Sequence, residues 1–156
     1  MRTRAAAVVV ALTGVVIVAM DWVPTPLNRN IEHGDPPQRI PGTLIHGVAC
    51  VLACLALARG PRWAQRLVPA WFTLVLASGV LNWWVPYLVG TYPGEIDPQT
   101  FEQEYATNLS FLPTLAGRPV VPDVQHTLIH SLLLASAVLS ARVAFGPRRL
   151  AGARRG

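Results

Sequence analysis

The chain has 156 residues, of which 52% are hydrophobic and only 13% are charged, and its mean hydropathy is positive at +0.39. Because soluble domains carry about 25% charged residues, this composition excludes a disordered tail and argues against an ordinary soluble domain. The net charge of +5 would suit nucleic-acid binding only if the basic residues shared one surface.

Four apolar runs are long enough to cross a bilayer, which takes a helix of about 20 residues. They are residues 5–23, 42–58, 67–90 and 124–145. Since backbone polar groups find no water partner in lipid, each run is predicted to be a helix. Arginines before the first run are also typical of a signal peptide. However, Ala19-Met20-Asp21 does not match a small-residue cleavage site, so the first run is predicted to be a membrane helix that is not cleaved. Residues 1–156 are therefore predicted to form a single all-α domain, a four-helix transmembrane bundle in the lipid bilayer.

The charges divide between the two ends of these runs. All 13 basic residues are arginines, and ten of them lie at one end: Arg2, Arg4, Arg59, Arg62, Arg66, Arg142, Arg148, Arg149, Arg154 and Arg155. The other three arginines and all eight acidic residues lie at the opposite end. The positive-inside rule then predicts cytoplasmic termini (N-in, C-in) in the plasma (inner) membrane. The basic tail 147–156 is read as a cytoplasmic anchor, so nucleic acid is not expected as a partner. The absence of lysine, with many Ala and Val, suggests a bacterial genome rich in GC.

Two longer connections are predicted on the outer side. Residues 24–41 contain five prolines and are expected to be irregular. Residues 91–123 are predicted to include a short extracytoplasmic helix, because Asp97 can cap it and Pro98 suits its first position. Phe101, Tyr105 and Leu109 would share its apolar face. Two roles stay open for the segment 95–113: a lid over the bundle, or a helix that packs at the membrane interface.

Polar residues inside the spans are costly and mark a site by default. Each predicted span carries at least one near its outer end, on the face where small residues would let helices approach. These residues are Asp21, His46, Asn82, His126 and His130. Pro86 lacks the N–H that would bond to the Asn82 carbonyl, which predicts a kink there. The sequence therefore predicts a polar pocket near the outer leaflet.

Three interpretations of the histidines stay open. His46, His126 and His130 could hold a divalent transition metal, since an i,i+4 histidine pair suits one ion. In a metal-free pocket, His126 or His130 would act as the acid or base, with Asp21 or Glu104 orienting it. The histidines could also only hydrogen-bond between helices. The residues predicted to contact a bound molecule are Asn82, Trp83, Tyr87 and Tyr105.

The leading functional hypothesis is a small multi-pass membrane protein whose pocket binds a metal ion or a small lipophilic molecule. Whether it is an enzyme is left undecided. The alternative is a non-catalytic accessory subunit in a homo-oligomer or a larger membrane complex. Small residues facing outward on more than one helix would favour that alternative. Cys50 and Cys54 lie on the small-residue face and are interpreted as packing residues.

Overall fold

The computed structural model describes residues 2–32 and 36–146, and no strand occurs among them. Four segments are long and apolar enough to cross a membrane. They are α1 (Arg2–Trp22), α2 (Pro36–Arg59), α3 (Arg62–Gly79) continued by η2 (Val80–Trp84) and α4 (Val85–Val89), and α6 (Val124–Ala144). Two short helices, η1 (Arg29–Glu32) and α5 (Pro98–Glu104), lie in the connections. The predicted all-α fold with four candidate spans is confirmed, and the predicted tail 147–156 lies outside the described residues.

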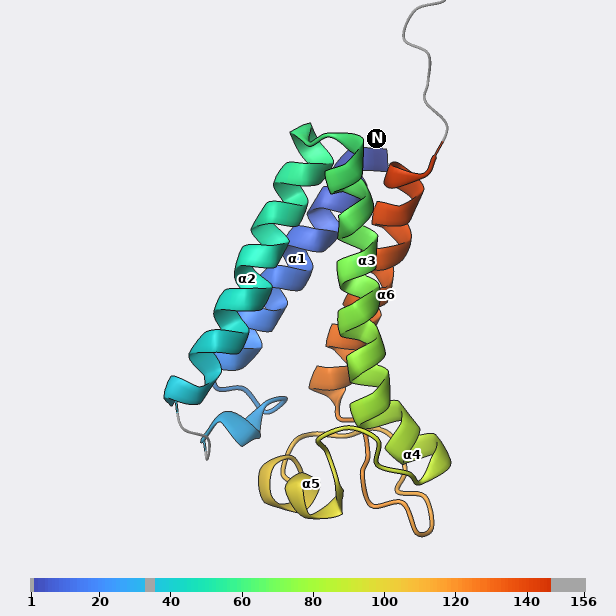
Figure 1. The fold of residues 1–156 in the computed structure, drawn as a ribbon. Coiled ribbons are helices and arrows are strands. Elements are labelled where there is room, and N and C mark those ends of the chain that lie inside the picture. The colour runs from blue at the N-terminus through green and yellow to red at the C-terminus, as the bar shows by residue number, and fades with distance from the viewer. Residues whose placement is uncertain (1, 33–35, 147–156) are drawn as a thin grey trace, which may run out of the picture.

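The helices pack in the order α2, α1, α6, α3 (Figure 1). Helices α2 and α3 contact each other little, and they diverge away from the short connection that joins them. The start of α1, that short connection and the end of α6 lie at one end of the bundle. Both long connections lie at the other end, beside α4 and α5.

Small residues bring α1 close to its two neighbours. A methyl group built on Gly14 would lie 2.8 Å from Cys50 Cβ, so only glycine allows α1 and α2 to approach this closely. On the other side of α1, the hydroxyls of Thr13 and Ser136 hydrogen-bond at 2.9 Å, and both residues are fully buried. Such packing and interhelical hydrogen bonds hold helices together in lipid, where the hydrophobic effect contributes little between them.

The proline-rich segment 24–41 is more regular than predicted. Helix α2 already begins at Pro36. Proline is compatible with a first helical turn, since the N–H groups of that turn have no helical acceptor and none is lost. Before it, the buried amide of Asn28 donates to the carbonyls of Met20 and Val23 at 2.6 and 2.9 Å. The Met20 carbonyl lies in the last turn of α1 and the Val23 carbonyl just after it, so neither has a helical N–H to accept. Asn28 therefore fixes how the chain leaves α1.

The kink predicted at Pro86 takes the form of a π turn. In η2 the N–H of Val85 bonds to the carbonyl of Val80, five residues earlier. This wider turn accommodates Pro86, which has no N–H to donate, and the chain stays helical. The same turn carries Trp83 and Trp84, which contact His126 and His130 on α6.

The short helix α5 begins as predicted. The Asp97 carboxylate accepts the Thr100 N–H at 2.7 Å, and this hydrogen bond lowers the pKa of Asp97. The helix ends at Glu104, so Leu109 does not extend its apolar face as predicted and is exposed in the following connection. The side of the membrane on which α5 lies remains a prediction.

We expect Gly14→Ala to lower the free energy of unfolding by about 1–3 kcal/mol, because the added methyl overpacks the contact with Cys50. Thermal unfolding in detergent measures the effect. Gly47→Ala is the matched control, since its methyl would meet Val18 at an ordinary 3.8 Å. Equal unfolding midpoints for the two variants would contradict the close α1–α2 contact.

Candidate functional site

A cavity of about 360 Å³ lies between the helices, and residues of both long connections help to line it. Its wall contains polar and hydrocarbon groups in comparable amounts. All four spans contribute to this central cavity, through Ile17, Met20, Asp21, Arg39, Gly42, His46, Val75, Gln125, His126, Ile129 and Leu133, and the connections add Ile31 and Tyr105. Its volume is at the lower end of the range for small-molecule sites.

His126 is held by Asp123 and Trp83. Its Nδ1 lies 2.9 Å from Asp123 Oδ1, and the same oxygen accepts the His126 backbone N–H at 2.7 Å. The second oxygen of Asp123 accepts the Asn108 side-chain amide at 2.7 Å. Trp83 stacks on the imidazole with ring centroids 3.8 Å apart. Because a carboxylate accepts, Nδ1 carries the proton in the neutral ring, and Nε2 is the nitrogen left for a ligand.

His46 has a similar arrangement on α2. Its Nδ1 lies 2.8 Å from the carbonyl of Gly42, one turn earlier. A carbonyl only accepts, so Nδ1 is the donor and Nε2 again is the nitrogen available to a ligand. The structure thus brings His46 and His126 to one cavity from helices that do not follow each other in the chain.

Asp21 and Arg39 line the cavity beside His46. Asp21 accepts the Thr43 hydroxyl at 2.6 Å. The Arg39 guanidinium donates to the backbone carbonyls of Ile31 and Asp21. The cavity therefore holds one carboxylate and one guanidinium, and the guanidinium donates to the protein at two carbonyls.

His130 lies outside the central cavity, although it is one turn from His126. Its Nδ1 accepts the Trp84 indole N–H at 3.0 Å, and the residue is buried. A methyl group on Gly79 would overlap the Nε2 edge of the ring, so α3 covers that edge. Both nitrogens are therefore occupied or covered, and His130 joins α6 to α3 and η2.

The histidines do not fit a shared metal ion. In residues 2–32 and 36–146, no three or more His, Cys, Asp or Glu side chains lie close enough to hold one. The predicted ligand set of His46, His126 and His130 is not assembled, because Trp84 and Gly79 enclose His130.

Two of the residues predicted to contact a bound molecule instead hold the connection between α4 and α6. Asn82 Oδ1 accepts the Glu95 N–H at 2.6 Å, and its amide donates to the Ser78 carbonyl. The buried Tyr87 donates its hydroxyl to the Pro113 carbonyl at 3.1 Å. Neither residue lines the central cavity.

Aromatic residues near α5 pack around His126, and of these Tyr105 lines the cavity. Trp83 is buried behind His126, and Tyr105 packs edge-on against it with ring centroids 5.0 Å apart. Tyr105 reaches the cavity, and burial raises its pKa above the ordinary value, with a further rise from the charge and hydrogen bond of neighbouring Glu104. Glu104 is itself exposed and does not line the cavity.

Sequence reasoning missed three residues. Asp123 caps the start of α6 and also orients His126. The spacing Asp123-x-x-His126 across a helix start could have indicated this. Arg39 and Gln125 also line the cavity, and no pattern singled them out.

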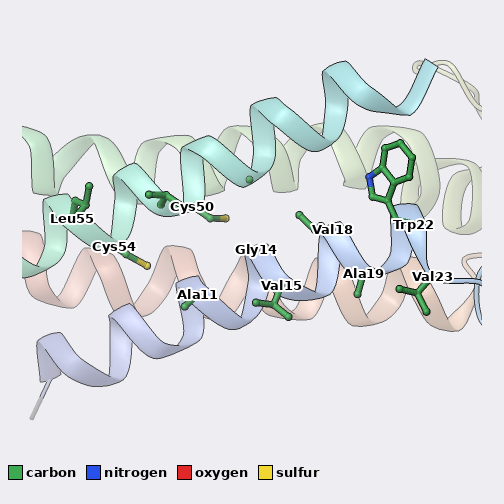
Figure 2. A pocket seen from close by; sticks show the side chains of 12 residues that line it. Ala11, Gly14, Val15, Val18, Ala19, Trp22, Val23, Cys50, Cys54 and Leu55 are labelled. Atoms are coloured by element: carbon green, nitrogen blue, oxygen red, sulfur yellow. The ribbon is translucent and has the colours of Figure 1, made fainter. Parts of the chain in front are cut away.

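A second hollow, of about 750 Å³, lies along the outward side of α1 and α2 (Figure 2). Its wall is almost wholly apolar and includes the small residues Ala11, Gly14, Ala19 and Gly47. Cys50 and Cys54 also line it as free thiols, and Cys50 packs against Gly14. We call this surface the α1–α2 groove.

We expect Trp84→Phe to lower the free energy of unfolding by about 1–3 kcal/mol, since it leaves the buried Nδ1 of His130 without a donor. Chemical or thermal unfolding in detergent measures the loss. Trp63→Phe is the control, because Trp63 is 68% exposed. An unchanged stability in Trp84→Phe would show that the indole hydrogen bond does not hold His130.

Comparison with protein-family models, curated proteins and solved structures finds no match to this chain.

Proposed function

We propose that the protein is a multi-pass protein of the inner membrane that holds a small amphiphilic molecule in the central cavity. The observation that carries this proposal is the cavity itself, which all four spans line and whose wall is half polar and half hydrocarbon. A simple structural bundle gains nothing from such a space, because voids and imperfectly paired polar groups lower stability.

The same site supports acid–base chemistry on the bound molecule. A buried carboxylate on Nδ1 fixes the imidazole of His126 and leaves Nε2 toward the ligand, as in enzymes that use histidine as a general base. In this proposal Asp123 takes the orienting role that the sequence suggested for Asp21 or Glu104. His126 would accept a proton from the bound molecule, and His130 would serve only as a structural residue.

Blocking the cavity tests the proposed function. A Cβ at Gly42 meets no atom within 4 Å, so Gly42→Phe is expected to fill the cavity without disturbing α2. Wild type and variant are purified in mild detergent after exposure to a total lipid extract, and bound small molecules are measured by native mass spectrometry. We expect a bound molecule in the wild type and at least a tenfold lower occupancy in Gly42→Phe, as steric exclusion costs more than 1.4 kcal/mol.

Leu44→Phe is the matched control, because Leu44 is 58% exposed on the same helix and its ring would face away from the cavity. It should keep the bound molecule. Equal occupancy in all three proteins, or none in the wild type, would refute the proposal.

The proposed orientation places both termini in the cytoplasm and α5 outside. Ten of the 13 arginines at one end of the four apolar runs, and all eight acidic residues at the other end, support it. In a background of Cys50→Ala and Cys54→Ala, a membrane-impermeant maleimide should label Gln103→Cys in intact cells. It should label Pro61→Cys only after the cells are opened. The reverse pattern would invert the topology.

An accessory-subunit role is the second candidate, and the α1–α2 groove favours it. Small residues of two helices face outward there, as a partner transmembrane helix requires. Ala11→Phe would fill the groove and should reduce the mass of the detergent-solubilised particle if a partner helix occupies it. A wild type that is already monomeric would exclude this role.

A further inference from the structure

The central cavity can be reached from the side of the bundle between α2 and α3. Gly42 lines the cavity from α2, yet it is exposed, and a Cβ built on it meets no atom within 4 Å. Val75 lines the cavity from α3 and is only partly buried. The rings of His46 and Trp71, with centroids 6.4 Å apart, join the two helices on the side nearer their short connection. Beyond this contact the helices diverge, and we call the space bordered by Gly42 and Val75 the α2–α3 opening.

The opening lies within the segments that suit a bilayer. Gly42 belongs to the candidate span Arg39–Arg59, and Val75 lies near the middle of the candidate span Arg62–Val89. Beside them in the chain, Ile45 is 55% exposed and Leu74 is 65% exposed. Exposed hydrocarbon side chains at this depth face lipid tails, so a molecule that passes the opening comes from the bilayer.

The cavity changes from polar to apolar along the direction of the helices. Asp21, Arg39 and His126 lie in the terminal turns of their helices, and His46 lies deepest among the charged groups and imidazoles. At the apolar end, Leu133 is about 14 Å from the start of α6, at 1.5 Å per residue. This is about half the ~30 Å thickness of the hydrocarbon layer. A membrane lipid has the same order, with its headgroup at the surface and its chain toward the middle.

The cavity is too small for a whole lipid. Its volume of about 360 Å³ suits a headgroup with a few carbons, whereas a hexadecyl chain alone is larger. A lipid whose headgroup lies in the cavity must therefore extend its chain through the α2–α3 opening.

We propose, resting on the proposed function, that the ligand is a lipid of the leaflet beside the long connections and that it enters laterally through the α2–α3 opening. Its headgroup lies among Asp21, Arg39 and His126, and its chain leaves between Gly42 and Val75 into the bilayer. A carboxylate, a guanidinium and imidazoles line the cavity, so they recognise a compact headgroup that both donates and accepts hydrogen bonds.

A photoreactive chain tests this route whatever the headgroup is. Cells that produce the full-length protein are fed hexadecanoic acid with a diazirine at mid-chain, which they incorporate into their lipids. The protein is purified in mild detergent to remove bulk lipid and is then illuminated, and adducts are located by peptide mass spectrometry. We expect adducts beside the opening, at Ile45, Leu74 or the exposed Ser78.

Gly42→Phe should lower the yield of these adducts about tenfold or more, because it excludes the headgroup that holds the lipid. Leu44→Phe is the matched control and should leave the yield unchanged, since Leu44 is exposed and does not line the cavity. Equal yields beside the opening in wild type and Gly42→Phe would overturn the inference. Adducts confined to the α1–α2 groove, at Val15 or Leu55, would also overturn it.

The co-purified molecule gives a second readout that needs only the wild type. We expect its mass and fragmentation to show a long alkyl, acyl or isoprenoid chain. A bound molecule without such a chain, displaced by Gly42→Phe, would overturn lateral lipid entry and leave the cavity as a binding site. No bound molecule in the wild type would refute both this inference and the proposed function.

Discussion

The carboxylate of Asp123 organises the part of the molecule on which the candidate site depends. It is 1% exposed, and a buried carboxylate is tolerable only when donors surround it. The donors here are the backbone N–H and Nδ1 of His126 and the amide of Asn108. One buried group thus begins helix α6, aims an imidazole and holds the connection that follows α5. His126, which Asp123 fixes in place, forms part of the cavity wall.

The three histidines near this end of the bundle show how environment decides the role of one residue type. His46 and His126 each bind the protein through Nδ1 and reach the central cavity. His130 receives the indole N–H of Trp84 and is covered by α3 at Gly79. His46 and His126 each keep one ring nitrogen that could bind a ligand, while His130 joins two helices. A glycine and a tryptophan on the neighbouring span make this difference.

Local features were predictable because their causes are local. The four apolar runs, the Asp97 cap of α5 and the Asp123 cap of α6 each follow from a few neighbouring residues. Predictions failed where distant residues decide. Asn82 lies at the predicted level of its span, yet the Glu95 N–H occupies its side chain. The helical residues from Pro36 onward were not predicted, because proline usually indicates the end of a helix. Proline favours a helix only in its first turn, and the sequence did not show where that turn lies.

The sequence by itself determined that the chain is helical and that four segments suit a bilayer, because hydropathy and helix length need no partner. It also indicated which polar residues lie near one end. Only the tertiary structure decided which of them share a space. Helix rotation and the π turn at Val80–Trp84 bring Trp84 to His130 and Trp83 to His126. These contacts join residues far apart in the chain, and spacing along one helix cannot specify which face of another helix it meets.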